Sequence, residues 1–140
     1  IFSDGILPYL LLHVRLAKKL AEEYGEKKII STKTLNELDH FFRGPLQSAL
    51  RLVDRRRVKR LTCPRGRTVY QVAGEARAFY TCLPSGNFCA CYSYLHQVLR
   101  RQEIPMCKHV LASRLAEALG TCDNVCCTDE TMMFLLHGLS

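Results

Sequence analysis

Apolar residues recur at helical spacing in three successive segments at the start of the chain. The first segment runs from a cap at Asp4 to a stop at Gly25. The second opens with the capping box Thr34-x-x-Glu37, and Pro45 then suits the first turn of a third helix. The positions expected to face a core are Leu7, Leu10, Leu11, Val14 and Ala21 in the first helix, Leu35, Leu38, Phe41 and Phe42 in the second, and Leu46, Ala49, Leu50 and Val53 in the third.

The pattern then changes to short β-type segments bounded by turn residues. Residues 58–63, 68–72 and 78–82 are predicted strands, and a short extended piece at 88–91 follows them. Helical spacing returns near the C-terminus. The predicted helices there are residues 92–101, with Leu95, Val98 and Leu99 inward, residues 107–119, ended by Gly120, and a last helix capped by Thr128 that carries Met132, Met133, Leu135 and Leu136.

This order of elements predicts an α+β fold with N-terminal helices, a small antiparallel β-meander and C-terminal helices. The length of 140 residues fits one domain, and the apolar share of 48% is enough to build a core. We expect one compact unit made of a helical region at 1–56, the meander with a metal-binding motif at 57–120, and a C-terminal helix at 121–140.

The net charge of +7 predicts an acidic partner, with nucleic acid first and an acidic protein surface second. A basic cluster between the third helix and the meander fits either phosphate contacts or a solvated turn. Its members are Arg55, Arg56, Arg57, Lys59, Arg60, Arg65 and Arg67. No apolar run reaches the ~20 residues of a membrane span, and residues 6–16 lack the features of a secretory signal. We therefore expect a soluble protein. Since the first residue is Ile1, we also expect the natural start of the chain to be missing.

Eight cysteines are many for a chain of this length. In a secreted protein they would indicate a disulfide framework, but such scaffolds are rich in loops. This chain has long amphipathic segments instead, and a histidine accompanies its paired cysteines. We therefore favour a reducing compartment in which thiolates bind a metal.

The strongest chemical signal is Cys89-Ala-Cys91 followed, after fifteen residues, by Cys107-Lys-His109. Zinc prefers a tetrahedron of sulfur and nitrogen ligands. Residues two apart on an extended segment point to the same face, so Cys89 and Cys91 can bind one ion. Residues two apart inside a helix point to nearly opposite faces. Cys107 is therefore expected just before the first turn of a helix, with His109 within that turn.

Four protein ligands would fill the tetrahedron and leave no position for water or substrate. The motif therefore predicts one structural zinc ion on Cys89, Cys91, Cys107 and His109, and no catalysis by that ion. The alternative reading is a set of buried cysteines near an ordinary helix histidine. His96 lies between the two ligand pairs and is a weaker substitute for His109.

The motif C-x-C-x(n)-C-x-H, preceded by a short meander and running into a helix, resembles the SWIM zinc finger. A wider pattern over residues 46–119 includes Leu52-Val53-Asp54-Arg55, Val69-Tyr70-Gln71-Val72, Tyr80-Thr81-Cys82-Leu83 and Val98-Leu99-Arg100 ahead of Cys107-Lys-His109. With these segments the chain also resembles the SWIM-domain subunits of the Shu complex.

The resemblance implies a nuclear, non-enzymatic accessory factor of homologous recombination. Subunits of this kind form a heterodimer with a RecA-like recombinase paralogue. The heterodimer supports recombinase filaments on single-stranded DNA in repair and meiosis, so DNA contact through the complex is also implied.

Two other functions compete with this one. The first is a self-sufficient nucleic-acid-binding zinc-finger protein that uses the basic cluster. The second is a thiol enzyme with Cys107 or Cys126 as nucleophile and His109 as base. The remaining cysteines are interpreted as thiols without a metal: Cys63 and Cys82 as small apolar residues on strands, and Cys122, Cys126 and Cys127 as buried or partner-facing groups rather than a second metal site.

Overall fold

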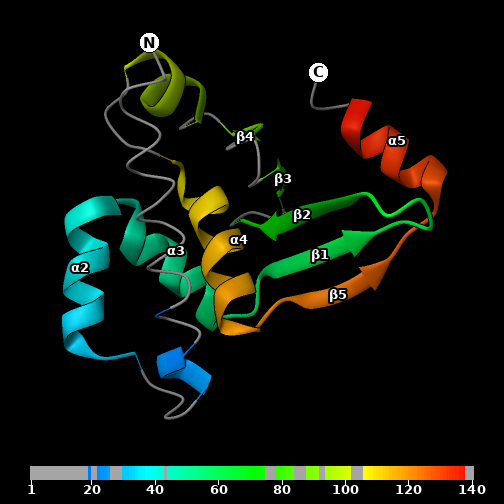
Figure 1. Ribbon diagram of the computed structural model, residues 1–140. Helices are drawn as coiled ribbons and strands as arrows, with labels where there is room; N and C mark the ends of the chain where they lie inside the picture. Colours follow the sequence, from blue (N-terminus) through cyan, green and yellow to red (C-terminus); the bar gives the residue numbers. More distant parts are fainter. Residues whose placement is uncertain are drawn as a thin grey trace.

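The computed structural model confirms an α+β architecture with helices around a five-stranded sheet (Figure 1). It describes residue 19 and residues 22–25, 30–42, 44–74, 78–83, 88–91, 94–101 and 106–137. The helix predicted from Asp4 to Gly25 lies mostly outside the described residues. Residues 22–25 of it are helical.

The sheet contains the predicted meander and one further strand. Its strands are β1 (Val58–Thr62), β2 (Thr68–Ala73), β3 (Phe79–Leu83), β4 (Phe88–Cys89) and β5 (Asp123–Cys126), in the order β4-β3-β2-β1-β5. The first four strands are antiparallel, whereas β5 pairs with β1 in parallel, with Leu61 opposite Val125. The sequence did not predict β5, because all four of its residues are exposed and no alternation of apolar residues marks it.

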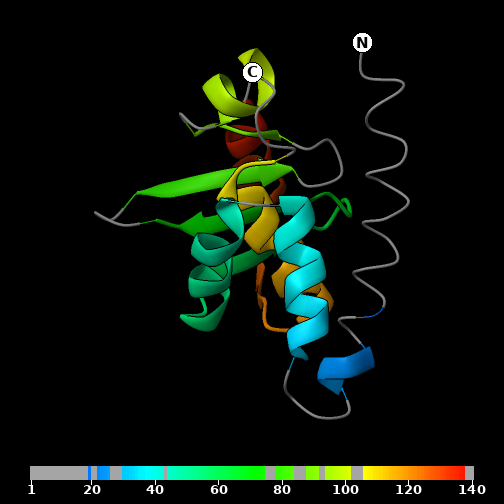
Figure 2. The same ribbon diagram turned by 90° about the vertical axis from the view of Figure 1, so that its left-hand side faces the viewer.

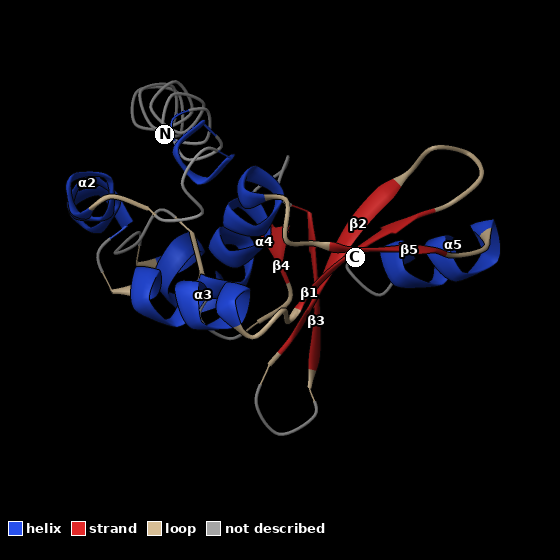
Figure 3. Ribbon diagram, turned by 90° about the horizontal axis from the view of Figure 1, so that it is seen from below, coloured by secondary structure: helices blue, strands red, loops and turns tan. Residues whose placement is uncertain are grey.

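The helices are α2 (Thr32–Phe42), α3 (Pro45–Asp54), the π-helix η3 (Tyr94–Arg100), α4 (Lys108–Leu119) and α5 (Asp129–His137). Helices α3 and α4 cover one face of the sheet, with α2 outside them, and α5 lies on the other side (Figure 3). Figure 2 shows η3 at the β4 edge of the sheet, away from β5 at the opposite edge.

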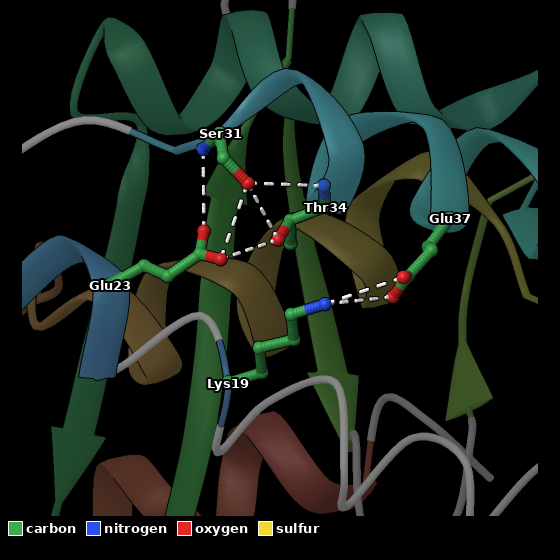
Figure 4. A network of polar contacts seen from close by, with 5 residues as sticks. All are labelled: Lys19, Glu23, Ser31, Thr34 and Glu37. Carbon is green, nitrogen blue, oxygen red and sulfur yellow. Dashed lines mark hydrogen bonds and ion pairs between the residues drawn. The ribbon is translucent and has the colours of Figure 1, made fainter.

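Helix α2 begins at Thr32, two residues before the predicted cap at Thr34. Ser31 is the residue that caps it, because its hydroxyl accepts a hydrogen bond from the Thr34 amide at 3.2 Å. Thr34 lies fully buried in the first turn, where its hydroxyl donates to Glu23 at 2.7 Å (Figure 4). Lys19 pairs with Glu37 at 3.2 Å. The predicted capping box was therefore wrong, and Glu37 instead helps to hold the preceding segment against α2.

Apolar side chains form a core on each face of the sheet. The main core joins Leu38 of α2, Leu46 of α3 and Leu111 of α4 to the sheet residues Val58 and Val72. The second core is smaller. It consists of Leu61, Cys63, Val69 and Met132, with Leu83, Cys127, Leu135 and Leu136 packed against it. Burial of these apolar faces fixes both helical layers on the sheet.

Two of the three predicted inward residues of η3 are exposed. Val98 is buried, but Leu95 and Leu99 are 43% and 41% exposed. A π-helix turns less per residue than an α-helix, so the α-helical spacing used for the prediction assigned the wrong face. Tyr94 takes the inward place and meets Phe88 edge to face, with ring centroids 5.1 Å apart.

Candidate metal centre

The four predicted ligands converge at the point where three elements meet. Cys89 ends β4, Cys91 follows it, Cys107 is the N-cap of α4 and His109 lies in the first turn of that helix. One ligand atom from each residue lies within 4.8 Å of all the others. All four residues are buried, and they form the one such group among the residues that the structure describes. Cys107 lies just before the helix and His109 lies within its first turn, as helix geometry predicted.

Two of the thiols each accept a hydrogen bond at the start of a helix. The Val110 amide of α4 donates to the Cys107 sulfur at 3.5 Å, and the Tyr94 amide of η3 donates to the Cys91 sulfur at 3.3 Å. Unpaired amides and the positive end of the helix dipole favour a thiolate at such positions. Each of these two amides therefore stabilises the thiolate form of the sulfur that it faces, which is the form that binds a metal.

The imidazole of His109 is held by its neighbours in one orientation. Its Nδ1 lies 3.8 Å from the Cys89 sulfur, and the ring stacks on Tyr80 with centroids 4.2 Å apart. The Ser113 hydroxyl donates to the His109 carbonyl at 2.9 Å. The other ring nitrogen, Nε2, is buried and has no hydrogen-bond partner among the described residues. Nδ1 is therefore the nitrogen that faces the sulfur cluster.

The thiols of the cluster interact strongly with one another. Hydrogen bonds with Cys89 and Cys91, together with burial, raise the pKa of the Cys107 thiol above its ordinary value. Hydrogen bonds from Cys107 and Cys89 hold the pKa of Cys91 well below its ordinary value. The protein alone thus favours one thiolate, and a cation is needed to neutralise the others.

This donor set fits zinc. Three thiolates and one imidazole are a standard structural set for this ion. The four ligand atoms lie within 4.8 Å of one another, close enough to converge on one ion. Four protein ligands fill the tetrahedron, so a bound ion would stabilise the join between β4 and α4 and would offer no open position.

A fourth buried sulfur lies beside the cluster. Cys82 of β3 pairs with Cys89 of β4 in the sheet register, and their sulfurs are 3.5 Å apart. Cys82 is not a member of the four-residue group. The sequence predicts only a packing role for Cys82. The antiparallel register of β3 and β4 is the signal that places it here.

The other candidate residues lie away from this centre. His96 is half-buried on η3 and is not in the group. Cys63 belongs to the second core, Cys122 packs at the edge of the main core, and Cys126 is exposed on β5. The described residues contain no second metal-binding group built on these cysteines.

The predicted basic cluster divides into separate groups. Arg55 and Arg57 line a cavity with His109, whereas Arg56 lines a different one. Arg65 lies beyond the far end of β1, where its side chain faces Asp129 at 4.0 Å. Arg60 is on β1, opposite Tyr70. Arg67 lies at the β1–β2 turn, and Lys59 points to the opposite face of the sheet from Arg60. The seven residues therefore lie at several different places in the fold.

Comparison with known proteins relates most of the chain to one family. Over 121 residues it is 34% identical to zinc finger SWIM domain-containing protein 7 of Homo sapiens, covering 86% of each chain. Over 122 residues it is 38% identical to the Danio rerio protein of the same name, covering 87% of each chain. The chain belongs to the SWIM-type zinc-finger proteins.

A more distant SWIM relative is the zinc finger SWIM domain-containing protein 7 homolog of Dictyostelium discoideum. It is 33% identical over 103 residues, which cover 73% of this chain and 66% of the relative. No family model matches the chain, and no solved structure matches it. Among the described residues, no helix is long and apolar enough to cross a membrane.

Proposed function

We propose that Cys89, Cys91, Cys107 and His109 hold one zinc ion and that this ion has a structural role. The observation that carries the proposal is the convergence of the four buried ligand atoms within 4.8 Å. A complete set of protein ligands supports a non-catalytic role, because a catalytic zinc ion keeps one position for water or substrate. The ion would fix the N-terminus of α4 to the end of the meander.

On this basis the chain is a non-enzymatic accessory subunit. It pairs with a RecA-like recombinase paralogue in the nucleus and supports recombinase filament assembly on single-stranded DNA in homologous recombination and meiosis. The resemblance to the SWIM-domain subunits of the Shu complex supports this role. Exposed apolar side chains suit a partner interface: Phe79, Leu95, Leu99, Met133 and Phe134 are all more than 40% exposed.

Co-expression with the RecA-like paralogue, followed by size exclusion and zinc analysis, tests the proposal. The expected result is a heterodimer with one zinc per copy of this chain. Cys89→Ala and His109→Ala should lose both zinc and partner. The exposed Cys126→Ala is the matched control and should keep both. Retention of zinc and partner by both ligand variants would contradict the proposed function.

Direct binding of DNA by the isolated chain is the second candidate function, and the four exposed cations at residues 51, 55, 57 and 108 favour it. A mobility-shift titration with single-stranded DNA at several salt concentrations separates the two functions. Tight binding by the chain alone, with a steep loss of affinity as salt rises, would indicate a self-sufficient nucleic-acid-binding protein. Binding that requires the paralogue would support the accessory role.

A further inference from the structure

A hollow lies among the helices, apart from the metal centre. Its volume is about 530 Å³, within the range of ~300–1,000 Å³ that ligand pockets show. The start of α2, one face of α3 and the end of α4 line it, and in Figure 1 the start of α2 and the end of α4 both lie at the lower end of the helical layer. None of the four metal-site residues is among the described residues that line it.

The floor of the hollow is apolar. Ile30 precedes α2, Leu50 lies on α3 and Leu119 ends α4. All three are half-buried and pack against the outside of the main core. Leu35 and Val53 complete the apolar lining. Because the half-buried side chains keep part of their apolar area in water, covering them with another apolar group is favourable.

A polar network fixes one wall of the hollow. The Ser31 amide, the Ser31 hydroxyl and the Thr34 hydroxyl all donate to the Glu23 carboxylate, at 3.2, 3.2 and 2.7 Å (Figure 4). Tyr24 and Ile30, which line the hollow, are direct neighbours of network residues in the sequence. The network therefore holds this wall in place, and the hollow is already formed before a ligand enters, as binding pockets usually are.

The rim of the hollow is polar and charged. Gln47, Arg51 and Asp54 are spaced by four and three residues, so they lie on one face of α3. Arg56 follows the helix with a left-handed backbone, φ being 53°, and also lines the hollow. All four residues are exposed, and no ion pair with another described residue engages Arg51, Asp54 or Arg56. Two arginines and one aspartate leave the rim with an excess of one positive charge.

Floor and rim together define the chemistry of a ligand. The apolar floor suits an aliphatic or aromatic side chain, and guanidinium groups at the rim suit carboxylates. The Gln47 amide and the Thr121 hydroxyl can each donate and accept a hydrogen bond, which suits the polar groups of a peptide backbone. The net charge of +7 on the whole chain also attracts acidic partners.

We propose that this hollow binds an acidic segment of a partner protein through one large apolar side chain. That side chain covers Leu50 and Leu119, and the Asp or Glu carboxylates that flank it pair with Arg51 and Arg56. Asp54 opposes this binding. The hollow is separate from the metal centre, so the binding depends neither on the proposed zinc ion nor on the pairing with a recombinase paralogue.

The test uses the zinc-loaded full chain at constant ionic strength. The probe is the short peptide Asp-Glu-Leu-Phe-Glu-Asp with blocked ends, and its binding is followed through the methyl NMR signals of Leu50 and Leu119. One control peptide has Ser-Ser in place of Leu-Phe, and a second has lysine in place of all the acids. Dodecanoate is titrated in parallel, because a fatty acid also combines a carboxylate with an apolar chain.

Three variants test the rim. Arg56→Gln removes a rim cation, and Asp54→Asn removes the rim anion. Arg55→Gln removes the same charge as Arg56→Gln from the neighbouring residue, which lines the other cavity, so it is the matched control. Zinc content and thermal stability are measured for every variant and should equal those of the parent chain, because all three side chains are exposed.

The acidic peptide should shift the methyl signals of Leu50 and Leu119 and leave those of Leu95 on η3 unmoved. Arg56→Gln should weaken its binding about fivefold and Asp54→Asn should strengthen it about threefold, as exposed ion pairs do. Arg55→Gln should bind as the parent chain does. The Ser-Ser peptide should bind at least about tenfold more weakly, because it has no large apolar side chain to bury.

Four results would overturn the proposal. They are the absence of binding by the acidic peptide, equal binding by either control peptide, an equal loss in Arg55→Gln and Arg56→Gln, and tighter binding of dodecanoate than of the peptide. The last result would make the hollow a site for fatty acids.

Discussion

The two faces of the sheet both bury cysteine, but in different chemical settings. On the helical face, Cys89, Cys91 and Cys107 lie with His109 in one group of ligand atoms. On the α5 face, Cys63 packs with Leu61, Val69 and Met132. The first group forms where a strand end meets a helix start, whereas Cys63 lies in a cluster of apolar side chains. The meeting of a strand end with a helix start, rather than the number of cysteines, therefore distinguishes the metal centre from the packing core.

The two faces also differ in the interactions that stabilise them. The helical face gathers thiols that cannot all lose their protons without a cation. The α5 face closes by burying apolar side chains, which needs no cation. Perturbing each face separately should therefore give distinct signatures in zinc content and stability.

The largest effect is expected from Cys107→Ala. This change removes one of four ligands, so zinc should be lost and the free energy of unfolding should fall by at least ~4 kcal/mol when free zinc is a thousandfold above its Kd. Chemical denaturation and metal analysis measure the two quantities. Cys126→Ala is the control and should change stability by less than about 0.5 kcal/mol. Full zinc content in Cys107→Ala would remove the distinction between the faces.

Met132→Ala tests the α5 face. Met132 is 1% exposed in the second core, so its truncation should lower the free energy of unfolding by about 3 kcal/mol while zinc content stays unchanged. The adjacent Met133 is 65% exposed, and Met133→Ala should lower it by less than about 0.5 kcal/mol. Release of zinc by Met132→Ala would show that the two faces are not independent.

Cys82→Ala sharpens the boundary of the metal centre. The Cys82 sulfur is 3.5 Å from that of Cys89, yet Cys82 is outside the four-residue group. We expect a loss of about 1 kcal/mol from the small void, with zinc retained at the parent level. A drop in zinc equal to that of Cys107→Ala would instead make Cys82 a ligand.

The smallest effect is a difference in thiol reactivity at constant stability. Burial, and after it the nearby Glu117 carboxylate, raises the pKa of Cys122 from 9.0 to about 11. At pH 8 its thiolate is then roughly a hundredfold scarcer than at the ordinary pKa, and its alkylation should accelerate as pH rises toward 11. Mass spectrometry of the zinc-loaded chain should find exposed Cys126 modified first. Early modification of Cys89, Cys91 or Cys107 would contradict their shielding by zinc.

Much of the meander and of the metal centre could be predicted from the sequence, because the signals there are local. Alternation and turn residues located β1, β2 and β3. Residues two apart inside a helix point to nearly opposite faces, and this rule correctly placed Cys107 at the cap of α4, ahead of His109. Gly120, with φ of 69°, ends that helix as its position indicated.

The features that the sequence did not reveal depend on tertiary contacts. Strand β5 carries only exposed residues and exists through its pairing with β1. The cap of α2 fell on Ser31 because Glu23, distant in sequence, reaches Thr34. Arg56 is separated from Arg55 and Arg57 by its left-handed backbone, with φ of 53°, which its residue type does not predict. Such features can be recognised only in the folded chain, because they depend on contacts between separate elements.

X-ray absorption at the zinc edge tests the central claim most directly. The chain purified with zinc should show three sulfur ligands at ~2.3 Å and one nitrogen ligand at ~2.0 Å. The nitrogen contribution should come from His109, because His109 is the only nitrogen donor in the group of four. A shell with an oxygen ligand would indicate an open position, and a shell of four sulfurs would replace His109 with Cys82. Either result would contradict a closed structural site made by Cys89, Cys91, Cys107 and His109.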